Sequence, residues 1–198
     1  MTGSSAPGRS DVVADPVRFD LGGGAELREW SADDAEEAYA EVDQNRDRLR
    51  DWLPWVDATR SPEDVRSFIE RCAQSEGRQR SFGIYVDGVL AGNIGLTLDE
   101  DNGGEVGYWI TAAFEGRGLI TEAVRALFRY GFEERGFRRM QLTAAVENER
   151  SRSVAERLGM TREGVLRRAG RIREDRYLDL VMYSMLREEW EAGAASDG

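Results

Sequence analysis

The stretch Tyr108–Ala123, YWITAAFEGRGLITEA, decides the predicted fold, because it reads as a strand, a loop with two glycines and the start of a long helix. The first turn of a helix offers unpaired N–H groups and a partial positive charge. Gly116 and Gly118 would let an anion approach the backbone closely. This pattern predicts a pyrophosphate cradle, although two glycines before a helix are also common as a simple turn. The loop matches neither G-x-x-x-x-G-K-[ST] nor G-x-G-x-x-G, which excludes those two phosphate-binding motifs.

Short strand and helix patterns surround this stretch, with no internal repeat or linker. Residues 80–98 predict two strands joined by the turn Asp87-Gly88, and 105–110 adds a third strand to an antiparallel meander. The amphipathic helix at 119–134 then leads to a strand at 139–146, which should lie parallel to the strand at 105–110. The other predicted strands are 25–30, 161–171 and 177–186, and the other helices are 31–42, 46–55, one that starts at Ser61, and 149–158. This order predicts a mixed α/β domain.

Length and charge narrow the possible classes of protein. A chain of 198 residues is long enough for one domain with a real core. Its 27 basic and 38 acidic residues give a net charge of −11, which argues against nucleic acid and anionic membranes as partners. All the basic residues are Arg, and the chain has no His, which excludes His bases, His-dependent nucleophiles and His-ligated zinc. We predict no metal site.

The two ends and the single cysteine carry little chemistry. Residues 1–20 and 191–198 are predicted as tails, because they have few large apolar side chains that could repay the entropy of ordering. Cys72 continues an apolar helix face, so we expect it to pack in the core rather than to form a covalent acyl-enzyme. No apolar run is long enough for a signal peptide or a membrane span, so a cytoplasmic protein is expected.

Five motifs together carry a resemblance to a known family. From about residue 25 to 190 the chain resembles the GNAT superfamily of acyl-CoA N-acyltransferases, and especially its RimJ/RimL-like branch. The matching motifs are Leu49–Trp55, Glu105–Ile110, Gly116–Ala123, Asn148–Ser151 and Ala155–Met160. The resemblance implies a GNAT acetyltransferase domain over 21–190. Its fold would be α/β (mixed α+β), with a central, mixed and mostly antiparallel sheet of about seven strands flanked by helices.

The resemblance implies acetyl-CoA as the donor, with its pyrophosphate on the amides from Gly116 to Thr121 and its pantetheine arm along Glu105–Thr111. It also implies a contact from Asn148 to the pantetheine arm, whereas the N-x-x-S spacing to Ser151 alone is equally typical of a helix cap. The predicted donor-binding residues are Trp109, Ile110, Thr111, Gly116, Arg117, Gly118, Leu119, Ile120, Thr121, Asn148 and Ser151.

Two positions depart from the pattern of the family. Glu115 stands where Gln or Arg is usual, and Ile120 stands where Gly or Ala is frequent. Glu115 is expected to reduce the positive potential near the phosphates, although backbone amides can still bind them. Arg150 and Arg152 are candidates for contact with the CoA 3′-phosphate, and solvated surface charge is the alternative for each.

Proton transfer must be carried out by residues other than His. The acceptor amine has to lose a proton, and Glu105 is the best carboxylate for this role; the alternatives are an exposed glutamate without a role and bulk water as the base. The resemblance places Ser151 near the thioester sulfur, where it would protonate the departing thiolate. Tyr183 is the alternative proton donor. The candidate catalytic residues are therefore Glu105, Ser151 and Tyr183.

The acceptor is expected to meet aromatic side chains. The resemblance places Trp52 and Trp55 over the acceptor cleft, where they would bind substrate together with Glu105; the alternative is that both tryptophans pack the first helices together. An α-amine with a pKa of about 8 costs roughly 1.4 kcal/mol to deprotonate at pH 7, whereas a lysine amine costs roughly 4.6 kcal/mol. A site with a weak base therefore favours an α-amine.

These observations predict an acetyl-CoA-dependent N-acyltransferase that acts by direct transfer in a ternary complex. The first acceptor hypothesis is the N-terminal α-amine of a protein. The second is a small amine such as an amino acid, a polyamine or an antibiotic, because a net charge of −11 would favour cations. A non-catalytic acyl-CoA-binding module is a third possibility, and the presence of Glu105, Asn148 and Ser151 together argues against it. The resemblance also raises the expectation of a homodimer.

Overall fold

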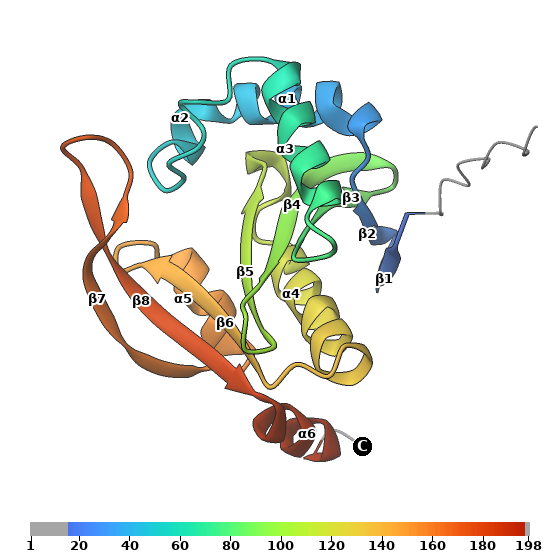
Figure 1. Cartoon of the computed structure of the whole chain (residues 1–198), viewed down its shortest axis with the longest axis vertical. Helices are drawn as coiled ribbons and strands as arrows, with labels where there is room; N and C mark the ends of the chain where they lie inside the picture. Colours follow the sequence, from blue (N-terminus) through green and yellow to red (C-terminus); the bar gives the residue numbers. More distant parts are fainter. Residues whose placement is uncertain (1–15, 197–198) are drawn as a thin grey trace, which may run out of the picture.

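One eight-stranded sheet forms the centre of residues 16–196, which are the residues that the computed structural model describes (Figure 1). The strand order is β1-β2-β3-β4-β5-β6-β8-β7, and every neighbouring pair is antiparallel except β5 with β6. The strands are β1 Arg18–Gly22, β2 Ala25–Glu29, β3 Gln79–Val86, β4 Val89–Leu98, β5 Gly103–Ile110, β6 Arg139–Ala145, β7 Thr161–Arg171 and β8 Tyr177–Leu186. The predicted central, mixed and mostly antiparallel sheet is confirmed.

Helices cover both faces of this sheet. They are α1 Ala35–Gln44, α2 Arg46–Leu49, α3 Pro62–Gln74, α4 Leu119–Arg129, α5 Glu149–Arg157 and α6 Arg187–Ser196. The helices α1, α2 and α3 share one apolar cluster with Trp30 and Trp109, whereas α4 and α5 belong to a larger cluster on the opposite face. None of the described helices is long and apolar enough to span a membrane.

Local sequence explains where two of these helices begin. A capping box between Ser61 and Asp64, with Pro62 in the first turn, starts α3. Gly118 has a φ of 78° and immediately precedes α4, whose apolar residues are buried. A π-helical turn, Tyr130–Glu134, continues α4, so the predicted helical span of 119–134 is helical throughout.

Three boundaries differ from the prediction. The strand β1 begins inside the predicted N-terminal tail of residues 1–20 and ends at Gly22, and it raises the number of strands from about seven to eight. Phe19 explains this strand, because its ring packs edge-on against Phe82 and Tyr130, residues far away in sequence. The helix α6 extends to Ser196, into the predicted tail of 191–198. The predicted helix at 46–55 is shorter, because α2 ends at Leu49 and turns follow before Pro54. Residues 1–15 and 197–198 lie outside the described part of the chain.

The parallel pair β5–β6 opens the sheet at its centre. The two strands pair only from Gly103↔Arg139 to Glu105↔Gln141, although β5 continues to Ile110 and β6 to Ala145. Beyond Glu105 the strands diverge, as Figure 1 shows. The β6-facing edge of β5 between Val106 and Ile110 therefore keeps backbone groups that no neighbouring strand engages, and this split positions the candidate site.

Candidate active site

A cleft of about 1410 Å³ occupies the split between β5 and β6. We call it the β5–β6 cleft and distinguish a donor end, at the loop before α4 and the start of α5, from an acceptor end, between the segment after α2 and the β7–β8 hairpin. Of the residues predicted from sequence, the cleft is lined by Trp52, Glu105, Trp109, Ile110, Gly116, Arg117, Gly118, Leu119, Ile120, Thr121, Asn148 and Ser151. The fold therefore brings most of the predicted residues into one cavity.

The donor end begins at the loop that precedes α4. Gly116 and Gly118 have φ values of 74° and 78°, in the left-handed region that favours glycine. A Cβ added at either position would meet no described atom within 4 Å, so the space above the loop is open. None of the described side chains caps the N-terminus of α4. The first-turn amides of α4 are thus available to an anion, as the pyrophosphate cradle requires.

Glu115 does not act as an isolated negative charge beside this loop. Its carboxylate accepts hydrogen bonds from the guanidinium groups of both Arg48 and Arg150. Arg48 also donates to the carbonyl of Ile110, and Asn45 Oδ1 accepts from the Ala112 amide at 3.0 Å. The unusual glutamate therefore joins the α1–α2 segment, the end of β5 and the start of α5. Its charge is balanced by these two arginines. Glu115 therefore lowers the positive potential near the donor phosphates by neutralising Arg48 and Arg150.

Ser151 sits at the junction of the donor and acceptor ends. Its backbone N–H donates to Asn148 Oδ1 at 3.1 Å, so Asn148 caps α5 while it also lines the cleft. The hydroxyl of Ser151 is 2.9 Å from the hydroxyl of Tyr108. Burial raises the pKa of Tyr108 to about 12, although the hydrogen bond with Ser151 opposes the shift. Tyr108 therefore stays protonated at neutral pH, next to the serine.

Tyr108 was not among the predicted site residues. It belongs to the Glu105–Ile110 motif, but its hydroxyl comes near Ser151 only because β5 and α5 pack together. One signal in the sequence could have identified Tyr108 as a site residue: it belongs to the strand that the resemblance already placed along the pantetheine arm.

Glu105 lies half-buried where β5 and β6 begin to separate. Its Oε1 accepts from Thr143 Oγ1 at 3.1 Å, and its Oε2 accepts from Gln141 Nε2 at 3.3 Å. No ion pair within residues 16–196 engages this carboxylate. An anionic carboxylate held by two neutral donors in the wall of a cleft can attract an ammonium group and accept a proton from it.

Three of the predicted site residues lie outside the lining of the cleft. Tyr183 is 1% exposed and pairs with Leu142, so it faces the core beneath α5, where its hydroxyl donates to Glu156 at 3.2 Å. It does not line the cleft, so its position does not support the role of proton donor. Trp55 is 38% exposed and also lies outside the cleft lining, as does Thr111, which is buried directly after β5.

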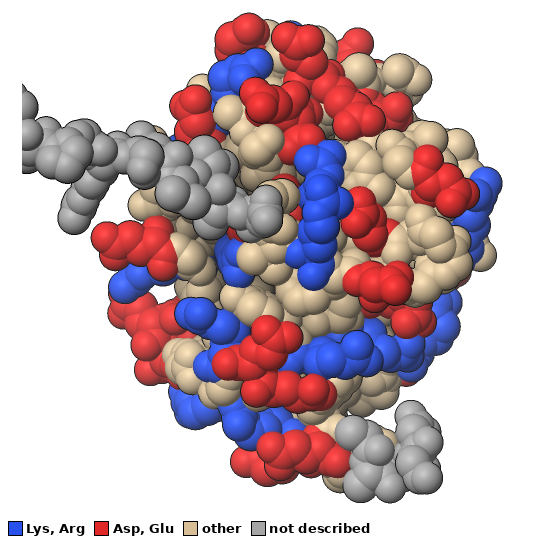
Figure 2. All heavy atoms as spheres, turned by 90° about the vertical axis from the view of Figure 1, so that its right-hand side faces the viewer, with Lys and Arg blue, Asp and Glu red and all other residues tan. Residues whose placement is uncertain are grey.

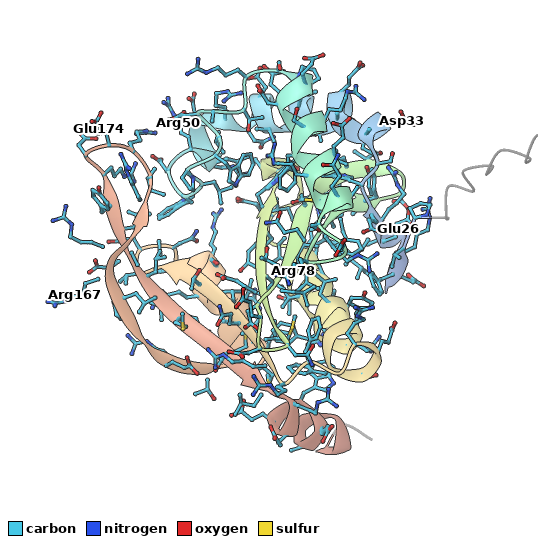
Figure 3. The ribbon with its side chains drawn as sticks, in the orientation of Figure 1. Glu26, Asp33, Arg50, Arg78, Arg167 and Glu174 are labelled. Atoms are coloured by element: carbon cyan, nitrogen blue, oxygen red, sulfur yellow. The ribbon has the colours of Figure 1, made fainter. Side chains whose placement is uncertain are left out.

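The acceptor end is built from segments that are far apart in sequence. Trp52 packs against a buried cluster of Ala145, Ile172 and Leu178, which come from β6 and the β7–β8 hairpin. The hairpin tip and the segment after α2 are also joined by ion pairs, Asp51 with Arg176 at 2.7 Å and Asp57 with Arg173 at 3.2 Å. Figure 3 shows Glu174 at this hairpin tip, near Arg50 of the facing segment. Trp52 thus lines the acceptor end of the cleft and packs across it, and its role in substrate binding stays a prediction.

Comparisons with known proteins identify the family. The model of the acetyltransferase (GNAT) domain matches residues 25–161. The chain belongs to the GNAT acetyltransferase family. It is 41% identical to the putative ribosomal N-acetyltransferase YdaF of Bacillus subtilis over 165 residues, which are 80% of this chain and 88% of YdaF. It is 28% identical to the ribosomal-protein-serine acetyltransferase of Escherichia coli over 152 residues, 75% and 84% of the two chains.

Solved GNAT structures share the fold and hold the expected co-substrate. RimL, the ribosomal L7/L12 alpha-N-protein acetyltransferase in complex with coenzyme A, superposes with a TM-score of 0.82 at 22% identity, over 87% of this chain and 99% of RimL, which shows the fold. The microcin C7 self immunity acetyltransferase MccE, in complex with acetyl-CoA and AMP, has a TM-score of 0.79 at 25% identity, over 84% and 94%. This GNAT chain is therefore an acyltransferase, and its open glycine loop, uncapped α4 and unpaired β5 edge have room and free backbone groups for a co-substrate such as those neighbours hold.

Proposed function

We propose that this GNAT enzyme acetylates the N-terminal α-amine of a protein, with ribosomal proteins as the acceptor class. The observation that carries the proposal is the single cleft that joins an uncapped helix N-terminus at one end to the Glu105 carboxylate at the other. The relatives from Bacillus subtilis and Escherichia coli support the acceptor class, since both are named for ribosomal acetylation.

The donor end would hold acetyl-CoA mainly through the backbone. The amides from Gly116 to Thr121 would bind the pyrophosphate, because their N–H groups and the dipole of α4 favour negative charge. The free edge of β5 offers hydrogen bonds to the amide groups of the pantetheine arm. The thioester would then lie between Ser151, the proposed proton donor, and Glu105, the proposed base.

Three proton transfers would follow from this placement. Glu105 accepts the proton of the acceptor ammonium, so that a neutral amine attacks the thioester carbonyl. When the carbon–sulfur bond breaks, Ser151 gives its hydroxyl proton to the CoA thiolate. The second proton that the nitrogen loses as the amide forms restores the serine hydroxyl, and Tyr108, whose hydroxyl is 2.9 Å from Ser151 Oγ, can relay it. An α-amine needs about 3 kcal/mol less for deprotonation at pH 7 than a lysine amine does, which favours a chain terminus as the acceptor.

The test compares acceptors under one assay of CoA release. We expect activity with short peptides that have a free N-terminal serine or alanine, and none with the same peptides after Nα-acetylation, even when they contain lysine. Mass spectrometry of the product locates the added acetyl group. Acetylation of the lysine alone, or of no peptide at all, would contradict the proposal.

A small-molecule amine is the second candidate acceptor. The structural likeness to MccE, which was solved in complex with acetyl-CoA and AMP, favours this alternative, as does a net charge of −11 that attracts cations. The same assay with amino acids, polyamines and amine-bearing nucleotides distinguishes the two: a small amine that reaches a higher kcat/KM than every peptide would favour the second candidate.

A further inference from the structure

The strand β7 presents an open edge. It is last in the strand order, and its outer edge has no strand partner among residues 16–196. Its side chains are nearly all exposed, including the large apolar Val165 and Leu166, which are 40% and 42% exposed. Unpaired backbone groups beside exposed apolar side chains form a template on which an extended chain can add as a further strand.

Positive charge is concentrated on this edge. The strand carries four arginines and one glutamate, and that glutamate, Glu163, already pairs with Arg139 at 2.5 Å. This pairing lowers the pKa of Glu163 to about 2, so its charge is fixed on the arginine at neutral pH. Arg168 lies over the ring of Tyr177, 4.9 Å from its centroid. Because Glu163 pairs with Arg139 of β6, it does not balance the positive charge of the arginines on β7.

None of the four arginines of this strand has an ion pair within the described chain: Arg162, Arg167, Arg168 and Arg171. Figure 3 shows Arg167 pointing away from the sheet into solvent. The rest of the protein carries a net negative charge. Residues 31–77 hold thirteen acidic and six basic side chains, and Figure 2 shows acidic side chains crowded at that end of the molecule. The β7 edge is therefore a basic strip on an acidic protein.

This strip leads directly into the acceptor end of the β5–β6 cleft. Ala169, Gly170 and Arg171, at the end of β7, line the cleft. The pairing of β7 with β8 shifts between Leu166 and Gly170, where the Arg168 amide donates to Asp179 Oδ1 at 2.6 Å. A chain that lies along β7 is thus delivered to the mouth of the site.

We propose that the outer edge of β7 binds an extended acidic segment of the acceptor protein, which adds to the sheet while its N-terminus enters the cleft. This proposal rests on the proposed function, since it supplies the acceptor. A second copy of this chain would set the same arginines against one another, and like charges on facing strands are unfavourable. Nucleic acid is disfavoured by the net charge of −11 and does not use the backbone ladder that an open strand edge offers.

The binding test uses peptides that cannot react. Each is Nα-acetylated, labelled at its C-terminus and about ten residues long, the length of a strand such as β7. A Glu-Val repeat carries the negative charge and can form a strand. A Glu-Pro repeat keeps the charge but lacks half of the backbone N–H groups, and an Arg-Val repeat reverses the charge. We expect the Glu-Val peptide to bind at least tenfold more tightly than either of the others, as measured by fluorescence anisotropy.

The variants separate the edge from the overall charge. Arg162→Glu with Arg167→Glu should weaken binding of the Glu-Val peptide at least tenfold. The matched control is Arg78→Glu with Arg129→Glu, which makes the same charge change at exposed residues outside β7 and should change binding less than twofold. Acetylation of a short neutral peptide should be unchanged in both variants, because none of these four residues lines the cleft. For an acceptor peptide with an acidic segment, the β7 variant should raise KM at least tenfold and leave kcat unchanged.

Equal binding of the Glu-Pro and Glu-Val peptides would overturn the proposal and indicate a general polyanion site, as for RNA. Equal losses in the β7 variant and the control would also overturn it. The proposed function fails in a different way: if no free α-amine is acetylated but the blocked Glu-Val peptide still binds along β7, the acceptor assignment is wrong and the docking edge remains.

Discussion

The two ends of the β5–β6 cleft are built in different ways. The donor end comes mostly from one continuous stretch, Tyr108–Ala123, and it works through backbone groups whose geometry two glycines set. The acceptor end combines side chains from the segment after α2, from β5 and β6, and from the β7–β8 hairpin. In the proposed mode of binding, the donor would meet a local backbone conformation, whereas the acceptor would meet side chains that only long-range packing assembles.

The largest effect is expected at the acceptor end. Glu105→Gln keeps the size of the side chain and its place beside Thr143 but removes the proton acceptor, so turnover at pH 6 should fall about 10²-fold or more. A rise in pH increases the neutral amine fraction and should partly rescue the variant, because solvent then takes the proton. The measurement is kcat from pH 6 to 9, with calorimetry to confirm unchanged binding of acetyl-CoA. Wild-type rates over the whole range would show that Glu105 has no proton-transfer role.

At the junction of the two ends, Ser151→Ala should lower turnover about 10²-fold with little change in donor affinity, since acid assistance to a leaving group is typically worth 10² to 10⁴. Tyr108→Phe should have a smaller effect in the same direction. Because the pKa of Tyr108 is raised to about 12, its protonation adds no step to the pH profile between pH 6 and 9. If the affinity for acetyl-CoA falls while kcat does not, Ser151 helps to bind the donor and does not transfer a proton.

The donor end is tested by Gly118→Asp. The φ of 78° is strained for aspartate, and the new carboxylate would repel the pyrophosphate, so affinity for acetyl-CoA should fall about tenfold or more. The matched control is Gly77→Asp, because Gly77 has a φ of 82°, equally open surroundings and a place outside the cleft. Calorimetry on both folded variants measures the affinity for acetyl-CoA. Equal affinities would show that this loop does not bind the pyrophosphate.

The smallest effect is expected for Glu115→Gln, which should strengthen donor binding and lower turnover. Loss of the carboxylate frees Arg48 and Arg150, so the donor phosphates should bind about threefold to fivefold more tightly as the local potential becomes more positive. The α1–α2 segment loses its link to the loop, so kcat should fall by a similar factor. Tighter binding should vanish in high salt. A drop in donor affinity would show instead that Glu115 holds the loop in its binding conformation.

Much of the fold could be predicted because its determinants are local. The capping box at Ser61, the turn at Asp87-Gly88 and the apolar side of α4 each specify an element within a few residues. The strand β1 could not be predicted in this way, since Phe19 is held by Phe82 and Tyr130 from distant elements. The same reasoning separates the site residues whose place was predicted from those whose place was not.

By itself, the sequence determined the family, the open glycine loop before α4 and the absence of His-based chemistry, because these depend on residue identity and on backbone conformations that neighbouring residues impose. Only the tertiary structure decided which side chains meet. The β6–β8 register turned Tyr183 into the core, the packing of α5 on β5 brought Tyr108 to Ser151, and two distant arginines neutralised Glu115. The physical reason is that strand register and helix packing are set by burial over the whole chain, and a shift of one residue in register moves every side chain of a strand to the opposite face.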